Sequence, residues 1–470
     1  MASRLLASLC VLCVLCGETL PSEPWATYRG NAARTGNTDG VPGPGQPAVL
    51  WAAKSQDHFL ASPVPVGDKL FVSALGGFNR PTISLFPLAA KGMAKPAWTK
   101  SAPYLTLASI SSPAVVGNTI VFGDGMHQDS GGMLHCLAAD SGKPLWQLLV
   151  PGNLVHLEGA PAVANGRVYV GGGAAGAFCL EHGKAVLDGK ELGLDEIAKL
   201  QDAKWKQLQE QFEKDKKVDP TTALDPNEGQ LHKPTPKKVW QKGQERWHVD
   251  APVNVVGDRV LVPSSYLDKE KVGERALFCL DAATGETKWT APLKLNPWGG
   301  ASVADGVAVV PGSSIGYYYN ELKGAKGDVT ALDLATGNPK WRKEIPGGVV
   351  GAVALADGLA VCTATDGKVR AFKLTDGERA WLYDTKTPAF APPAVVGGVA
   401  YVADLLGTVH AIDAKTGAAK WTLSIGKEAG APGMVYGGVT VHGGKLFVAT
   451  CNLEGPSARK ETAVVCIGSK

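Results

Sequence analysis

Short apolar runs recur along most of this chain, and residues that favour tight turns separate them. Pro113–Val121 has the pattern of a strand, a Gly-containing turn and a second strand, and Ala394–Val402 has the same form. Runs of this length, rich in Val and Ile and joined by Gly-containing turns, predict β-hairpins. The sequence therefore predicts an all-β protein built from many short strands.

An eleven-residue pattern that ends in tryptophan follows these hairpins. In Ala411–Trp421 an apolar strand runs into Asp-x-x-Thr-Gly, and the returning strand carries the tryptophan. Asp and Thr side chains bond nearby backbone N–H groups in such a turn, and Gly supplies its positive φ. Each period then holds four short strands, which is one blade of a β-propeller. Further copies are Cys136–Trp146, Cys279–Trp289, Ala331–Trp341 and Ala371–Trp381.

Eight tryptophans mark the expected outermost strands. They are Trp51, Trp98, Trp146, Trp240, Trp289, Trp341, Trp381 and Trp421. Trp51 lies on a strand without three strands before it, and three strands without a fourth follow Trp421. We therefore expect the N-terminal strand to complete the last blade, which leaves no free edge. This predicts one eight-bladed propeller over residues 48–470; seven blades would result if the weak period Ser62–Trp98 were not a blade.

The repeat is interrupted once, between Trp146 and Trp240. We place an insertion at residues 182–238, between the third and fourth strands of the third blade. Apolar residues from Leu194 to Phe212 share one helical face, which predicts a helix over 194–216 that ends before Pro220. One interpretation lays this helix on the flank of the propeller, and the other leaves it exposed to dock a partner.

The N-terminus has the pattern of a secretory signal. Arg4 precedes the apolar run Leu5–Cys16, so we expect a cleaved signal peptide at 1–20, an extension at 21–47, and a periplasmic or secreted protein. A lipid anchor is not expected, because leucine precedes both Cys13 and Cys16 where a lipoprotein needs a small residue. No later segment is long and apolar enough to span a bilayer.

Charge and cysteine content exclude several classes. The 47 basic and 44 acidic residues are balanced and form no basic stripe, which argues against nucleic-acid binding. Without CxxC pairs after the signal or an HExxH motif, a transition-metal site is not expected. Cysteines in equivalent slots of different blades are too far apart to bridge, whereas Cys451 and Cys466 share a blade, so their pairing stays open.

The motif in Ala411–Trp421 resembles the tryptophan-docking motif of the pyrroloquinoline-quinone-type propeller repeat family. Trp25–Asn31 and Arg34–Gly36 resemble a segment that precedes the first blade in secreted members of this family. The resemblance implies that the tryptophan rings pack between neighbouring blades and are structural.

Members of this family differ in function. Some are quinoprotein dehydrogenases that hold the quinone and a calcium ion at the mouth of the central channel, whereas others are cofactor-free scaffolds of outer-membrane assembly. This chain lacks the adjacent cysteine pair of the alcohol-oxidising members. We therefore expect a non-catalytic scaffold without a cofactor, which binds a protein or envelope component through a propeller face or the inserted helix. The alternative is a dehydrogenase that uses pyrroloquinoline quinone (PQQ) with calcium; a third possibility is a hydrolase or polysaccharide-binding propeller.

Candidate binding residues lie in the loops that enter the first strands of three blades. Carboxylate and amide oxygens at this mouth could hold calcium, and an indole could stack on a planar ligand. In the other interpretation these groups satisfy strand ends or line a water-filled channel. No catalytic residue is assigned. The candidates are His156, Glu158, His248, Asp250, Asn296 and Trp298.

Overall fold

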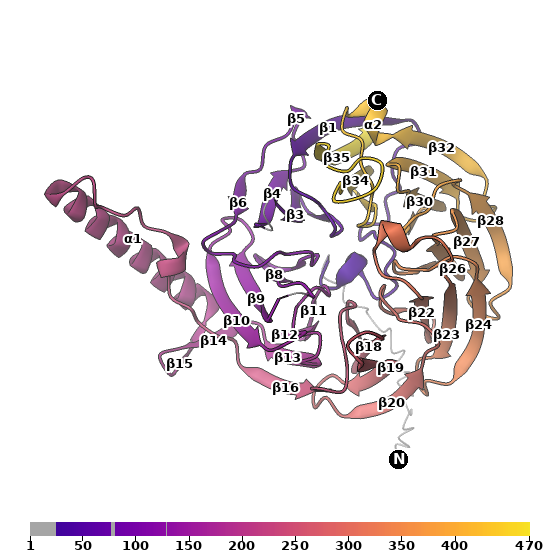
Figure 1. The fold of residues 1–470 in the computed structure, drawn as a ribbon, viewed down its shortest axis with the longest axis horizontal. Coiled ribbons are helices and arrows are strands. Elements are labelled where there is room, and N and C mark those ends of the chain that lie inside the picture. Colours follow the sequence, from indigo (N-terminus) through magenta and orange to yellow (C-terminus); the bar gives the residue numbers. More distant parts are fainter. Residues whose placement is uncertain (1–24, 77–79, 128) are drawn as a thin grey trace, which may run out of the picture.

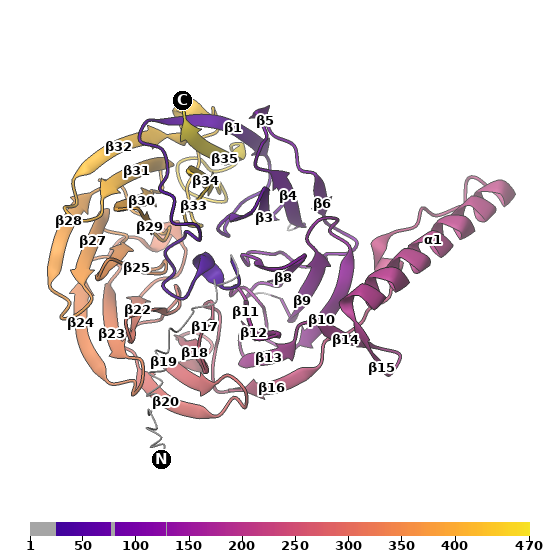
Figure 2. The ribbon, with the colours of Figure 1, turned by 180° about the vertical axis from the view of Figure 1, so that it is seen from behind.

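The protein is an eight-bladed β-propeller from which one long helix projects (Figures 1 and 2). The computed structural model describes residues 25–76, 80–127 and 129–470, so the predicted signal peptide lies outside the described residues. Each blade is an antiparallel sheet whose strands follow one another outward from the axis. The prediction of eight blades is confirmed, and the seven-bladed alternative is wrong because the period Ser62–Trp98 does form a blade.

Four concentric rings of strands make up the propeller. The innermost strands are β2 (Val64–Val66), β7 (Ala114–Val116), β11 (Ala162–Ala164), β17 (Asn254–Val256), β21 (Ser302–Ala304), β25 (Ala354–Ala356), β29 (Ala394–Val396) and β33 (Thr440–His442). The second strands are β3 (Lys69–Leu75), β8 (Thr119–Gly123), β12 (Arg167–Gly171), β18 (Arg259–Leu267), β22 (Val307–Ser313), β26 (Leu359–Thr363), β30 (Val399–Ala403) and β34 (Lys445–Ala449). The third strands are β4 (Pro81–Pro87), β9 (Gly131–Ala138), β13 (Ala177–Glu181), β19 (Val272–Asp281), β23 (Gly327–Asp333), β27 (Lys368–Lys373), β31 (Thr408–Asp413) and β35 (Thr462–Ser469). The outermost strands are β6 (Trp98–Lys100), β10 (Pro144–Pro151), β16 (Lys238–Lys242), β20 (Thr287–Pro292), β24 (Pro339–Ile345), β28 (Arg379–Asp384), β32 (Ala419–Ser424) and β1 (Pro47–Ser55).

The two ends of the propeller chain meet in the last blade. Strand β1 pairs antiparallel with β35, which places Trp51 opposite Cys466. The short strand β5 (Gly92–Met93), from the first blade, pairs with β1 on its outer side. The N-terminal strand thus supplies the missing outermost strand of the last blade, and the ring is closed as the sequence predicts.

The tryptophans of the repeat connect neighbouring blades. All eight lie on outermost strands, and the indole N–H of Trp341, for example, donates to the carbonyl of Leu374 in the next blade at 3.0 Å. The ring also lies against the backbone of Gly377, the glycine of the next Asp-x-x-Thr-Gly-type turn. Equivalent indole bonds run from Trp146, Trp240, Trp289, Trp381 and Trp421 to carbonyls of His182, Ala282, Leu334, Ala414 and Pro44.

Small side chains face these rings across each blade. In seven blades the residue that pairs with the tryptophan is a cysteine or an alanine, which leaves room for the indole. The six cysteines of the described residues are buried free thiols. The pairing of Cys451 with Cys466 that the sequence left open is therefore not formed, and Cys466 instead occupies the slot opposite Trp51.

The insertion forms an arm, residues 182–237, that connects β13 to β16. It contains the hairpin β14 (Lys184–Leu187) and β15 (Lys190–Gly193), the helix α1 (Leu194–Val218) and the 3-10 turn η3 (Glu228–Gln230). Figure 1 shows α1 extending away from the ring. Only Ile197 and Gln201 of the helix are buried, so the interpretation that the helix lies on the propeller flank is wrong beyond its first turns.

Polar contacts hold the base of the arm. The Gln201 side chain donates to the carbonyl of His232 and accepts from its N–H, so the returning segment is tied to α1. Asp202 on the helix pairs with Lys143 of the second blade, and Glu228 in η3 pairs with Lys100 of the first blade. The arm therefore has a defined direction at its base, although its outer half contacts only its own returning segment.

Residues 25–36 form an axial segment inside the ring of innermost strands, where Figures 1 and 2 show the 3-10 turn η1 (Tyr28–Gly30). The innermost strand of a blade has one edge without a neighbouring strand, and its N–H groups need acceptors. The axial segment supplies these acceptors to six of the eight blades. The N–H groups of Val115, Val163, Val303, Leu355, Val395 and Val441 donate to the carbonyls of Trp25, Ala26, Ala32, Ala33, Thr35 and Gly36.

Two fully buried arginines fasten the axial segment. The Arg29 guanidinium donates to the carbonyls of Pro393 and Val439, and Arg34 donates to three carbonyls at the starts of β17 and β21. Burial lowers the pKa of Arg29 to about 10 and that of Arg34 to about 9. Both side chains therefore keep their charge at neutral pH, where they bridge blades that are far apart in the sequence.

The contact between indole and glycine can be tested with a matched pair of substitutions. Gly417 and Gly398 have nearly the same φ, +74° and +72°. A Cβ added to Gly417 would lie 2.9 Å from the Trp381 side chain, whereas a Cβ added to Gly398 would meet no atom within 4 Å. Gly398→Ala should cost about 1–2 kcal/mol of unfolding free energy because of φ alone. Gly417→Ala should cost about 1–3 kcal/mol more, because the ring must move. Urea denaturation measures both; equal losses would contradict the docking role.

The fastening by buried arginines predicts a second difference in stability. Arg34→Met removes the donors of three carbonyls, those of Ala301, Pro252 and Val253, and should lower the unfolding free energy by at least about 2 kcal/mol. The matched control is Arg246→Met, because 76% of the Arg246 side chain is exposed; it should change stability by less than about 0.5 kcal/mol. Similar melting temperatures for the two variants would show that the axial segment does not stabilise the ring.

Candidate functional site

Two kinds of loop lie at one end of the propeller, which we call the mouth. Because the strands of a blade are antiparallel, the loops entering the innermost strands lie at the same end as the loops that join second to third strands. The Asp-x-x-Thr-Gly turns and the arm join third to outermost strands, so they lie at the opposite end. Any site built from the entering loops is therefore remote from the arm.

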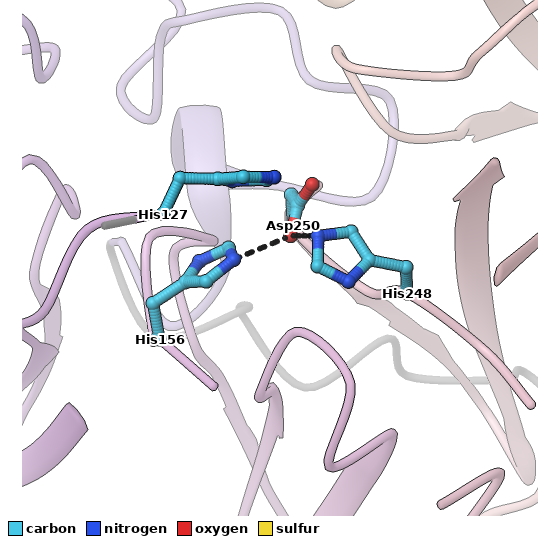
Figure 3. Close-up of side chains that lie close together, drawn as sticks. All are labelled: His127, His156, His248 and Asp250. Atoms are coloured by element: carbon cyan, nitrogen blue, oxygen red, sulfur yellow. Dashed lines mark ion pairs between the residues drawn. The ribbon is translucent and has the colours of Figure 1, made fainter. Parts of the chain in front are cut away.

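Three histidines and one aspartate meet at the mouth and form what we call the histidine cluster (Figure 3). His127 lies in the β8–β9 loop, His156 in the loop entering β11, and His248 with Asp250 in the loop entering β17. One donor atom from each of the four residues lies within 4.8 Å of the others. Three chain segments from neighbouring blades thus converge on one point.

Asp250 lies at the centre of the cluster. Its Oδ1 is 2.9 Å from Nε2 of His248 and 3.3 Å from Nε2 of His156. Neither contact has the alignment of a hydrogen bond, and the ring nitrogens of both histidines and the carboxylate oxygens lack a hydrogen-bond partner among the described residues. Both histidine side chains are fully buried. These groups converge without satisfying one another.

Glu158 lies behind the cluster. One of its oxygens accepts the backbone N–H of His127 at 3.0 Å and is 3.5 Å from Nδ1 of His156. Glu158 therefore holds the His127 loop and faces the ring nitrogen of His156 that points away from Asp250. Such an outer carboxylate sets the orientation of an imidazole.

Burial dominates the protonation of the cluster. Desolvation lowers the pKa of His156 to about 4, against the opposing charge of Asp250, and it also lowers the pKa of His127. Burial and the nearby Asp250 raise the pKa of Glu158. For Asp250 burial acts in the upward direction, but the imidazoles of His248 and His156 outweigh it and lower the pKa. At neutral pH His156 is thus a neutral imidazole, with one unprotonated ring nitrogen that can accept a hydrogen bond or coordinate a cation.

An apolar cluster lies on the other side of the mouth. Val350, Phe390, Leu405, Met434, Tyr436 and Cys451 form a buried cluster there, against which Trp298 packs. A strap, residues 314–326 with the 3-10 turn η4 (Tyr319–Glu321), joins β22 to β23 and crosses to the last blade. The N–H of Tyr319 and the hydroxyl of Tyr436 both donate to Glu454. The strap is thereby fixed over the apolar side.

The candidates from the sequence divide into two groups. His156, His248 and Asp250 come together in the histidine cluster, and Glu158 lies beside them. Asn296 does not join them, because its amide bonds the backbone of Tyr266 and accepts from Arg275. Trp298 packs in the apolar cluster.

Sequence reasoning missed His127. It considered only the loops that enter innermost strands, although the loops joining second to third strands lie at the same end. No metal-binding motif in the sequence points to the cluster, because its donors come from three separate loops.

Comparison with known proteins agrees with the architecture. The family model described as "Outer membrane protein assembly factor BamB" matches residues 46–211 and 296–452, more than half of the chain. The chain belongs to this BamB family. No curated protein shows significant similarity to it.

Solved structures share the fold of this BamB-family chain at low sequence identity. BamB from Moraxella catarrhalis is 15% identical, with a TM-score of 0.56, and the match covers 89% of this chain and 99% of that one. A europium-containing methanol dehydrogenase is 14% identical, with a TM-score of 0.57 and coverage of 96% and 99%. The computationally designed Ika8 protein is 11% identical, with a TM-score of 0.57 and coverage of 89% and 99%. These likenesses concern the fold alone.

The mouth of this BamB-family chain is a poor match for a quinone held by calcium. Calcium prefers oxygen ligands, whereas the converging donors are mostly imidazole nitrogens. The amide of Asn296 is occupied by Tyr266 and Arg275, and Trp298 packs against other apolar side chains. The residues therefore do not fit this group, and we derive no step through it.

Within the described residues, no helix has the length and apolar character that crossing a membrane requires.

The strap contact predicts a local change in dynamics. Glu454→Ala removes the acceptor shared by Tyr319 and Tyr436, so amide hydrogens of residues 314–326 should exchange faster while the blades keep their protection. Glu321→Ala, on the same strap, is the matched control and should leave exchange unchanged. Hydrogen exchange followed by mass spectrometry measures both. Unchanged exchange in Glu454→Ala would show that this carboxylate does not hold the strap.

Proposed function

We propose that this chain is a non-catalytic scaffold of the cell envelope, exported by its N-terminal signal, which binds another protein through the arm. The observation that carries the proposal is the arm itself: a 25-residue helix that leaves the ring and is held at its base by specific contacts. Because few of its side chains are buried, this long helix adds little packing to the ring. Its surface is therefore available to a partner.

The tip of the arm supports a protein partner. Val218 is 88% exposed and Leu224 is 87% exposed, and both lie where α1 ends and the chain turns back. Burying these two side chains against a partner would remove apolar surface from water, which favours association. The description of the family model, which names outer membrane protein assembly, is consistent with a scaffold that works by protein contacts.

The poor match between the mouth and a calcium-held quinone supports the non-catalytic part of the proposal. The donors that converge there are mostly nitrogen, and the side chain best suited to stack on a planar ligand is packed among apolar residues. A scaffold requires no such ligand.

The repeat itself provides a clean deletion of the arm. In the seventh blade the turn 413–418 connects the same strand positions that residues 181–237 connect in the third, because Ile412 pairs with Ala419 as Leu180 pairs with Lys238. Replacing 181–237 by the sequence of 413–418 also restores an acceptor for the indole of Trp146, since Ala414 corresponds to His182. We expect this variant to keep the propeller circular-dichroism spectrum.

Cross-linking in the envelope fraction, followed by mass spectrometry, tests the proposal. The full chain should cross-link to a defined protein through the arm, and the arm-less variant and the double substitution Val218→Ser with Leu224→Ser should lose that product. Leu406→Ser, which changes a 55% exposed leucine on the ring, is the matched control and should retain it. A product that survives removal of the arm, or calcium-dependent binding of PQQ with substrate-dependent dye reduction, would contradict the proposal.

A further inference from the structure

The donor set of the histidine cluster is that of a transition-metal site. Three imidazoles and one carboxylate suit Zn²⁺ and its first-row neighbours, whereas magnesium and calcium take oxygen. Among residues 25–76, 80–127 and 129–470, no other group of three or more such side chains comes together in this way. The cluster is therefore a particular feature of this mouth and does not repeat from blade to blade.

The spacing of the donors is close to that of a coordination shell. Ligand atoms about 2.0–2.1 Å from a tetrahedral zinc ion lie roughly 3.3 Å apart. Asp250 Oδ1 is 3.3 Å from Nε2 of His156 and 2.9 Å from Nε2 of His248. The donor atom of His127 lies within 4.8 Å of the other three donor atoms. His127 is a partly exposed loop residue, so it can move closer to them. Asp250 thus already lies at ligand spacing from both buried histidines, and His127 can close on the ion.

Buried polar atoms without partners point to a ligand at this position. Both nitrogens of His156, both of His248 and both carboxylate oxygens of Asp250 lack hydrogen bonds within the described part of the chain. A buried polar group without a partner costs about 1–3 kcal/mol, so native proteins rarely leave several together. A bound cation would take one donor atom from each of the three side chains at once.

The surroundings hold the His156 ring in an orientation suited to coordination. Glu158 faces Nδ1 of His156, so Nε2 is turned toward Asp250. Gly173, with φ +55°, lies against the same ring, and a Cβ there would be 3.0 Å from Nε2. A side chain at position 173 would therefore intrude on the space next to the coordinating nitrogen, which the glycine leaves open.

From this geometry we propose that the histidine cluster is a zinc site in which His127, His156, His248 and Asp250 are the ligands and Glu158 is the outer carboxylate that orients His156. The ion ties together the loops of the second, third and fourth blades at the mouth. The site lies at the end of the propeller opposite the arm, so the inference does not rest on partner binding.

Titration of the chelator-treated full chain with Zn²⁺, in competition with a chromophoric chelator, tests the proposal. We expect one equivalent to bind, the melting temperature to rise, and Co²⁺ to give the intense visible absorption of a four-coordinate centre with nitrogen and oxygen ligands. Glu158→Gln should weaken binding about 10–100-fold, as outer-shell changes do. His127→Ala and Asp250→Asn each remove a ligand. Each should therefore weaken Zn²⁺ binding more than Glu158→Gln does, by more than about 100-fold.

His410→Gln is the matched control. His410 also faces a buried aspartate, Asp404, at 3.2 Å, but both of its ring nitrogens have hydrogen-bond partners, Asp404 and Tyr383. This variant should bind Zn²⁺ as the unmodified chain does. His127→Ala changes a partly exposed loop residue, so its fold should remain intact by circular dichroism. Failure of the unmodified chain to bind one equivalent would overturn the assignment, and so would variants His127→Ala and Asp250→Asn that bind Zn²⁺ as tightly as the unmodified chain.

Discussion

The contact between each tryptophan and the next blade is the interaction on which the rest of this structure depends. A four-stranded blade has two apolar faces and cannot bury them alone, so it needs a neighbour on each side. In four blades the indole meets this need by packing its ring on the glycine of the neighbouring turn while its N–H bonds a carbonyl there, as Trp341 does with Gly377 and Leu374. A chain of such contacts is complete only when the last blade reaches the first. The strand β1 carries Trp51 into the last blade, where its ring stacks on Phe86 of the first blade with the ring centroids 6.2 Å apart.

Closing the ring produces a second requirement, at the axis. The innermost strands present N–H groups toward the centre, and the axial segment supplies carbonyls to six of them. Two buried arginines then cross from this segment to blades that lie hundreds of residues away in the sequence. Protein therefore occupies the axis, and the space in which side chains from several blades can meet is the mouth.

The mouth has two unlike sides. The apolar side is packed around Phe390 and Tyr436 and held under the strap by Glu454, whereas the polar side brings together histidines whose buried nitrogens have no protein partner within the described residues. The arm leaves the opposite end of the ring. A small ligand at the mouth and a protein partner at the arm would thus occupy separate surfaces at opposite ends of the ring.

Local patterns in the sequence determined the fold, because every blade repeats the same strands, turn and tryptophan. Such a repeat can be recognised without knowing which residues are in contact. They also determined the helix of the arm, whose observed end at Val218 is two residues beyond the predicted one. The sequence did not determine what that helix packs against, since an amphipathic face looks the same whether it covers a flank or its own returning segment. It also did not reveal that Cys466 stands opposite Trp51 rather than bonded to Cys451. His127, His156 and His248 come from three loops whose donor atoms lie within 4.8 Å of one another only because neighbouring blades pack side by side, so the character of the mouth was decided by tertiary structure.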